Sequence, residues 1–289
     1  MLDLHIHSNF SDGSETIESI IDSLKRKEIK LFSITDHDTI TGNEYLLKNL
    51  KKELQDNDLT FITGIEISTE FNNKPLHILA YNFELNNPTI RKLIKQGQKN
   101  RKIRTLKRIE LLKSEFQIEL PDYAKQQIIQ MDNPGRMHIA KVLLEMKKGN
   151  EIGEILRKYL YHTVEIASIS AKYVVTELAK SGITSVIAHP LCIRAGGQPI
   201  ILTPEELRKN VELLSVCGLN GLECFYSDYG SHEREIISSI AKDNGLLLSA
   251  GSDFHGKFKA VKLGELSKDN KKININEITI LNNLITNKN

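Results

Sequence analysis

Imidazole and carboxylate side chains recur along this chain in short segments where strands are expected to end. The segments are Asp3-Leu4-His5-Ile6-His7, Ser11-Asp12-Gly13, Thr35-Asp36-His37-Asp38, Gly64-Ile65-Glu66, His77-Ile78-Leu79, Ala188-His189-Pro190 and Gly251-Ser252-Asp253-Phe254-His255. Groups spread this widely can share a site only if the fold brings strand ends together. They would then form a polynuclear metal centre with mixed nitrogen and oxygen ligands.

The candidate ligands indicate a metal site more strongly as a set than one at a time. They are His5, His7, Asp12, His37, Glu66, His77, His189, Asp253 and His255. One histidine taken alone is more often a hydrogen-bonded structural residue than a ligand. Two pairs spaced i, i+2, His5 with His7 and Asp253 with His255, place ligands on one face of an extended segment.

Short apolar runs that alternate with helical patterns must position these groups. Strands are expected at 2–7, 31–35, 59–68, 76–83, 184–188, 221–225 and 246–250, and helices at 16–27, 45–54, 171–180, 204–216 and 232–244. Such alternation predicts a parallel sheet. Seven strands with polar groups at their ends predict an α/β fold, a closed, TIM-like barrel with its site at the C-terminal strand ends.

The alternation is interrupted between residues 89 and 169, where nearly every pattern is helical. We therefore expect a barrel domain formed by residues 1–88 and 170–289. Residues 89–169 would be a helical insertion that forms one wall of the site.

The motifs resemble the PHP (polymerase and histidinol phosphatase) superfamily. The matching segments are HIHSNFSDG at 5–13, ITDHDTITG at 34–42, GIEIS at 64–68, HILAY at 77–81, AHP at 188–190 and GSDFHG at 251–256. The resemblance implies a distorted (β/α)7 barrel that holds three divalent metals. Imidazole and carboxylate ligands without thiolate would accept Mn, Fe or Zn.

The resemblance also implies a ligand set for each metal. One metal would take His5, His7, Glu66 and Asp253, a second would take Asp12, His37 and His255, and a third would take His77, His189 and a bridging Glu66. Clustered divalent ions lower the pKa of a bridging water and neutralise a phosphate ester under attack. Asp36 and Asp38 could orient a ligand or accept a proton, or could be turn and capping carboxylates.

Residue 12 and the insertion bear on the substrate. Histidinol-phosphatase-like members commonly carry His where this chain has Asp12, so the pattern looks more like the branch that acts on nucleotide and RNA 5′-phosphates. Arg101, Arg104 and Arg108 recur at helical spacing in a basic segment, residues 91–113, and could bind further phosphates or form a solvated face.

Two further pairs are candidates for substrate contacts. The segment Gly135-Arg136-Met137-His138-Ile139-Ala140 resembles one in the same branch, where Arg136 would contact phosphate and His138 would assist the leaving group. Simple helix capping is the alternative for both. Tyr226 and His232 follow a late strand and could line a nucleotide pocket.

Bulk properties exclude several classes. The net charge of +2 does not mark a nucleic-acid binder, and three cysteines without C-x-x-C spacing argue against a disulfide framework or a zinc ribbon. No apolar run approaches a membrane span, and the chain starts directly with a strand pattern, so we expect a cytoplasmic protein. No obligate protein partner is evident.

The expected function is metal-dependent hydrolysis of phosphate esters. The preferred substrates are nucleoside 3′,5′-bisphosphates or short 5′-phosphorylated RNA trimmed from 5′ to 3′. The alternatives are a phosphatase of a small metabolite such as AMP or histidinol phosphate, a non-catalytic nucleic-acid-binding PHP module, and hydrolysis of a non-phosphate substrate.

Overall fold

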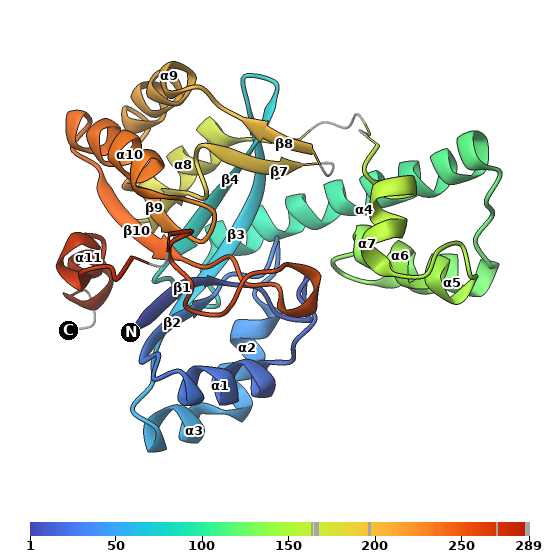
Figure 1. The fold of residues 1–289 in the computed structure, drawn as a ribbon, viewed down its shortest axis with the longest axis horizontal. Helices are drawn as coiled ribbons and strands as arrows, with labels where there is room; N and C mark the ends of the chain where they lie inside the picture. The colour runs from blue at the N-terminus through green and yellow to red at the C-terminus, as the bar shows by residue number, and fades with distance from the viewer. Residues whose placement is uncertain (163, 165–167, 196–197, 270, 287–289) are drawn as a thin grey trace.

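A nearly closed, barrel-shaped sheet forms the centre of the molecule (Figure 1). The computed structural model describes residues 1–162, 164, 168–195, 198–269 and 271–286. The strand order is β1 (Leu2–Ile6), β2 (Leu31–Ile34), β3 (Thr60–Phe71), β4 (Lys74–Tyr81), β6 (Thr184–Ile187), β9 (Gly221–Tyr226) and β10 (Leu247–Gly251). A parallel bridge between Ile6 and Phe254 joins the first strand to the segment after the last. The predicted α/β barrel class is confirmed.

The sheet is not wholly parallel, and the prediction was wrong at β4. This strand runs antiparallel to both β3 and β6. Asn72 and Asn73 both have positive φ, the backbone that a two-residue hairpin turn requires, so the chain reverses directly from β3 into β4. The start of β4 therefore lies at the same barrel end as the C-terminal parts of the parallel strands. Short strand β5 (Ile169–Ser170) pairs with β3, and β7 (Cys192–Ala195) forms a separate hairpin with β8 (Gln198–Ile201).

Helices cover the outside of the barrel. They are α1 (Ile17–Arg26), α2 (Thr41–Asn49), α3 (Lys51–Asp56), α8 (Ala171–Lys180), α9 (Pro204–Ser215), α10 (Ser231–Asp243) and α11 (Leu281–Thr286), with short 3₁₀ turns η2 (Gly256–Phe258) and η3 (Ile275–Glu277). The single helix expected at 45–54 begins earlier and is divided at Leu50 into α2 and α3. Apolar residues of α1 at helical spacing are buried against β1 and β2, as amphipathic packing predicts.

The segment between β4 and β5 projects from the barrel as a group of helices (Figure 1). These are α4 (Pro88–Phe116), α5 (Asp122–Gln130), α6 (Arg136–Glu145), α7 (Ile152–Ile155) and the π-helix η1 (Leu156–Leu160). The first turns of α4 bury Ile90 and Leu93 in the barrel core, whereas Ile109 and Leu112 belong to the core of the helical group. Helix α4 thus connects the two cores, and the domain boundaries at 88 and 170 stay a prediction.

No helix in the described part of the chain is long and apolar enough to cross a membrane. The three cysteines, all within that part, form no disulfide.

Candidate metal centre

The nine candidate ligands converge at one end of the barrel. Together they are called the histidine–carboxylate cluster below. Glu66, buried in the middle of β3, is its hub, because each carboxylate oxygen faces different imidazoles. Its Oε2 lies 3.3 Å from His5 Nε2, 3.0 Å from His7 Nε2 and 3.2 Å from His37 Nδ1. Its Oε1 lies 2.9 Å from His77 Nδ1 and 3.1 Å from His189 Nε2.

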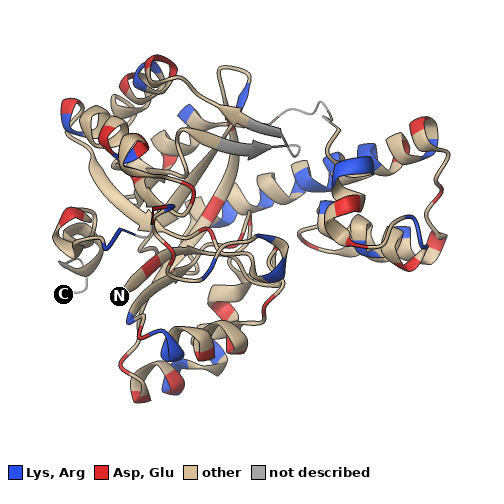
Figure 2. Cartoon of the chain, viewed as in Figure 1, with Lys and Arg blue, Asp and Glu red and all other residues tan. Residues whose placement is uncertain are grey.

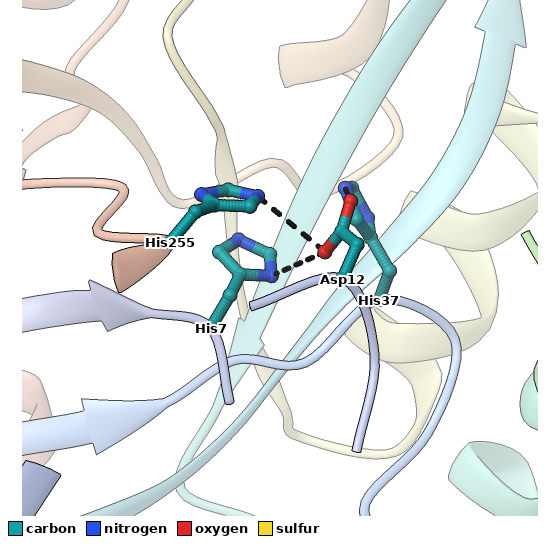
Figure 3. A group of neighbouring side chains, drawn as sticks. All are labelled: His7, Asp12, His37 and His255. Atoms are coloured by element: carbon teal, nitrogen blue, oxygen red, sulfur yellow. Dashed lines mark ion pairs between the residues drawn. The ribbon is translucent and has the colours of Figure 1, made fainter. Parts of the chain in front are cut away.

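Asp12, the most exposed carboxylate of the cluster, faces three imidazoles (Figure 3). Its Oδ1 lies 3.5 Å from His7 Nδ1 and 3.4 Å from His255 Nε2, and its Oδ2 lies 3.8 Å from His37 Nε2. Asp253 stands across the cluster, with Oδ1 at 3.3 Å from both His7 Nε2 and His255 Nδ1. The strand-end segments noted in the sequence therefore do meet.

The donor set fits divalent metal ions. Among the residues that the structure describes, three groups have ligand atoms within 4.8 Å of one another. They are His7, Asp12, His37 and His255; His5, His7, Glu66 and Asp253; and His37, Glu66 and His77. His5 Nε2 and His7 Nε2 converge to 3.1 Å, and the Nδ1 atoms of His7, His37 and His189 are buried without a hydrogen-bond partner. Buried ring nitrogens without partners, next to carboxylates, fit a site that holds cations.

The groupings differ slightly from the expected ligand sets. His7 joins the Asp12 group as well as the Glu66 group, and His37 joins Glu66 and His77. His189 contacts the same oxygen as His77, Glu66 Oε1, and the two ring centroids lie 5.3 Å apart. The assignment of each ligand to a particular ion stays a proposal.

Charges within the cluster are strongly coupled. Burial by itself would lower the pKa of His7, but hydrogen bonds to Asp253 and Glu66 raise it to about 10. Burial lowers the pKa of His37 to about 3. Burial would raise the pKa of Glu66, yet the surrounding imidazoles, His37 first, hold it well below its usual value. Glu66 is thus ionised and available as a ligand at neutral pH.

Buried carboxylates outside the cluster hold its members in place. Glu223 on β9 accepts a hydrogen bond from the His5 ring, with 2.8 Å between Nδ1 and Oε1, and another from the backbone N–H of His189 at 2.8 Å. Asp36 accepts bonds from Ser8 and Ser11 at 2.6 Å each and so fixes the loop that carries Asp12. Carboxylates of this kind orient metal ligands and keep their tautomers.

Comparison with known proteins identifies the family. The model of the PHP domain matches residues 3–174. The chain belongs to the PHP domain family.

Relatives of this PHP protein are similar along nearly their whole length. A 5′-3′ exoribonuclease of Haemophilus influenzae is 25% identical over 270 residues, which cover 91% of this chain and 93% of the relative. A 3′,5′-nucleoside bisphosphate phosphatase of Chromobacterium violaceum is 26% identical over 263 residues, covering 88% and 87%. The structure of a candidate metal-dependent phosphoesterase from Bifidobacterium adolescentis superposes with a TM-score of 0.78 at 24% identity, covering 96% of this chain and 94% of the other.

The predicted family and enzyme class are therefore confirmed. The protein is a metal-dependent phosphoesterase of the PHP family, a hydrolase of phosphoric ester bonds. The number and identity of its metal ions, and its substrate, stay predictions.

Asp38 and Arg101 fasten the helical group of the PHP protein beside its cluster. Asp38 lies next to a cluster histidine, with one oxygen paired to Arg101 Nε and the other accepting from Ser68 N at 2.9 Å. Asn133, between α5 and α6, donates to the carbonyl oxygen of His37 at 2.6 Å. Since the hydrogen bonds of Asp36 and Asp38 already occupy their oxygens, the geometry favours orientation over proton transfer for both.

Arg104, Arg108 and Arg136 gather next to this anchor. Arg108 Nε and Arg136 Nη1 are buried without a hydrogen-bond partner, and the Arg136 guanidinium lies over the ring of Tyr161 at 5.4 Å. Burial, together with the neighbouring arginines, holds the pKa of Arg108 well below its usual value, and burial lowers the pKa of Arg104 to about 10. Buried like charges of this kind need an anion.

Of the remaining predicted residues, His138 and Tyr226 lie near the site, whereas His232 has no contact with the cluster among those described. His138 caps helix α6, because its Nδ1 accepts from the backbone N–H of Gly135 at 3.1 Å, and only its Nε2 is left for a substrate. The Tyr226 hydroxyl donates to Asp253 Oδ2 at 3.1 Å, so Tyr226 adjoins the cluster. His232 lies exposed in the first turn of α10, and none of the contacts described for the cluster involves it.

Sequence reasoning missed Glu223, Asn133 and Lys259. Glu223 carried a signal, since a lone carboxylate in the apolar strand Gly221–Tyr226 must find a buried partner. Asn133 and Lys259 lie in loops without a distinguishing pattern. Lys259 contacts Asp253 and Tyr226, and only the fold places it there.

Proposed function

We propose that this phosphoesterase removes a terminal phosphate from nucleotides that carry a second phosphate, namely nucleoside 3′,5′-bisphosphates or short 5′-phosphorylated RNA. One observation carries the proposal: buried arginine nitrogens without partners lie beside a histidine–carboxylate cluster. The relatives named as a bisphosphate phosphatase and an exoribonuclease support it.

The cluster would hold three divalent ions, Mn, Fe or Zn. His5, His7, Glu66 and Asp253 would hold one, Asp12, His37 and His255 a second, and Glu66, His77 and His189 a third. The two oxygens of Glu66 face the imidazoles of the first and third sets, which supports its bridging role. When bound, such ions lower the pKa of a coordinated water and neutralise the negative charge that develops on the phosphoryl group.

Protein side chains would position the rest of the substrate. The arginines on α4 and Arg136 on α6 would bind the second phosphate by guanidinium pairing, since Arg104 and Arg108 have no carboxylate partner among the described contacts. Arg101 differs, because Asp38 and Ser68 already engage two of its nitrogens, so its contact with phosphate stays a prediction. His138 Nε2 would face the leaving oxygen.

A small phosphomonoester such as AMP or histidinol phosphate is the second candidate. Either would use the histidine–carboxylate cluster but would leave the arginine group without a ligand. Asp12 in place of the usual His favours nucleotides over histidinol phosphate. The cytoplasmic location also stays a prediction.

Metal removal tests the reaction. The protein is stripped with a chelator, reconstituted with Mn, Fe or Zn, and assayed on a 3′,5′-bisphosphate, AMP, short 5′-phosphorylated RNA and histidinol phosphate. We expect turnover only after reconstitution, and we expect it to be fastest with the bisphosphate or RNA.

Substitution of candidate ligands is a second test of the reaction. His5→Ala and Asp253→Ala should abolish turnover and keep the circular dichroism spectrum of the wild type. The control is His162→Ala, which changes an exposed histidine of the helical group and should stay active.

Two results would contradict the proposal. If the His5→Ala enzyme is still active, the metal centre does not carry out the reaction. A protein that binds RNA but hydrolyses none of the four substrates would be a binding module.

Arginine substitution tests the second-phosphate site. Losing a charged hydrogen-bond donor to phosphate costs roughly 1.5–3 kcal/mol, so Arg108→Met should raise KM for a 3′,5′-bisphosphate about tenfold or more. KM for a monophosphate and kcat for both should change little. Lys99→Met removes a charge from the exposed face of the same helix and serves as the control. Equal increases in KM for both substrates would refute the role.

A further inference from the structure

Asp253 presents its two carboxylate oxygens to different surroundings. Oδ1 faces the cluster, at 3.6 Å from His5 Nε2 and 3.3 Å from His7 Nε2. Oδ2 points away from these imidazoles and accepts from the Tyr226 hydroxyl at 3.1 Å and from the ammonium of Lys259. A carboxylate can bind a cation through one oxygen or through both, so the partners of Oδ2 affect which mode is open.

Lys259 and Tyr226 form a connected pair of donors. Lys259 follows the 3₁₀ turn η2, is mostly buried, and donates to the Tyr226 hydroxyl at 2.9 Å with its Nζ 5.1 Å from the ring centroid. The hydroxyl in turn donates a hydrogen bond to Asp253 Oδ2 at 3.1 Å. Two donors thus converge on one oxygen, and one of them carries a full positive charge.

The tyrosine is itself fixed in the barrel. Tyr226 ends β9, is 1% exposed, and packs between the rings of His189 at 5.7 Å and Tyr229 at 4.9 Å. Tyr229 is held in turn by the N–H of Leu191 at 2.8 Å. The orientation of Oδ2 is therefore set by the barrel and not by a mobile surface chain.

We propose that Lys259 is a positioning residue: with Tyr226 it holds Asp253 Oδ2, so that Asp253 offers the metal centre only Oδ1. The inference rests on the proposed metal centre. A one-oxygen contact leaves coordination space for water or substrate on the centre, and a fixed cation offsets the charge of the second oxygen. Lys259 acts through Asp253 and not on the substrate.

Three variants test this role, each reconstituted with Co²⁺ and with the metal that gives highest activity. Lys259→Met removes the charged donor, Tyr226→Phe removes the neutral donor without a change of charge, and Lys259→Arg keeps both charge and donation. Lys257→Met, an exposed lysine of the same turn, is the matched control. Wild-type protein is first shown to bind metal, because a failure at that step would overturn the metal centre itself.

We expect Lys259→Met to lower kcat by roughly tenfold to a hundredfold, the usual range for partners of metal ligands, with KM nearly unchanged. Tyr226→Phe should lower kcat in the same direction, and Lys259→Arg should keep most of the activity. The visible spectrum of bound Co²⁺ should weaken in Lys259→Met, because a second oxygen from Asp253 raises the coordination number. The Lys257→Met variant should match wild type.

Several outcomes would overturn the proposal while leaving the metal centre intact. Lys259→Met with wild-type kcat and an unchanged Co²⁺ spectrum would show that Oδ2 needs no such partner. A raised KM at constant kcat would make Lys259 a substrate contact. Equal losses in Lys259→Arg and Lys259→Met would reduce its role to packing. If Lys259→Met fails to fold, Tyr226→Phe decides the matter alone.

Discussion

Backbone conformations with positive φ recur at the residues around the cluster. His189 has φ of 31°, Asp38 of 52° and Asp253 of 56°. This left-handed region is uncommon for residues other than glycine, and non-glycine residues found there concentrate at functional sites. Hydrogen bonds hold each of the three in place, for example from His189 N to Glu223 and from Asp253 N to His5 O. The orientation of these side chains is thus set by the backbone conformation as well as by packing.

Metal binding should depend on pH through His7. Its pKa of about 10 without metal means that the ring carries a proton at neutral pH, and a ligand must lose that proton. Affinity for a divalent ion should therefore rise with pH, by up to about tenfold per unit for each proton released. Chelator competition between pH 6.5 and 8.5 measures this, and calorimetry in buffers of different ionisation enthalpy counts the protons. An affinity that does not change with pH would contradict a protonated His7.

At the scale of elements, one buried ion pair anchors helix α4 to the barrel. Asp38 precedes α2, and Arg101 lies midway along α4 in the basic stretch visible in Figure 2. Burial would raise the pKa of Asp38, but Arg101 first and then His37 hold it below its usual value. Because the folded-state pKa is lowered, the pair contributes stability above about pH 4 and loses it as the pH falls through the folded-state value.

Removing only one partner of this pair should lower the unfolding free energy more than removing both partners. Arg101→Met leaves a buried carboxylate without its cation, which typically costs about 3–5 kcal/mol of unfolding free energy. Arg101→Met combined with Asp38→Asn should recover most of that loss. Urea denaturation of the two single variants and the double variant gives the coupling energy. If the two losses simply add, Arg101 and Asp38 are not paired in solution.

The sequence predicted most elements but not how they pair. Apolar periodicity located all seven strands of the barrel, because buried strands alternate with amphipathic helices. The expectation of a parallel sheet was wrong for β4, because a short turn at Asn72 and Asn73, with no crossover helix, joins it to β3 and makes the pair antiparallel. The cluster was predicted by ligand type and order. Glu223 and Lys259 were not, because their roles depend on contacts between residues far apart in the chain.

At the scale of the whole molecule, closure of the barrel and assembly of the cluster are the same event. His7 N donates to Phe254 O at 2.9 Å and Asp253 N donates to His5 O at 2.8 Å, which joins the first strand to the segment after the last. The same few residues supply four of the candidate ligands. A change that separates these two segments should therefore disrupt the fold and the site together.

Gly251→Ala tests this coupling. A Cβ at residue 251 would lie 2.2 Å from His5 Cβ and 2.8 Å from His5 N, so β1 and β10 would have to move apart. We expect a loss of about 1–3 kcal/mol in unfolding free energy without metal, together with weaker metal binding. Gly153→Ala is the control, because its new Cβ would meet nothing closer than 3.4 Å. If Gly251→Ala lowers stability but leaves metal affinity unchanged, closure of the barrel and assembly of the cluster are separate events.

The joining of the first and last strands also has a consequence for biosynthesis. His5 and His7 leave the ribosome long before Asp253 and His255 are made, so a nascent chain can offer an ion only part of its final coordination sphere. Contacts of such sequence separation also slow folding. The candidate ligands can therefore come together as one site only after Asp253 and His255 have been made.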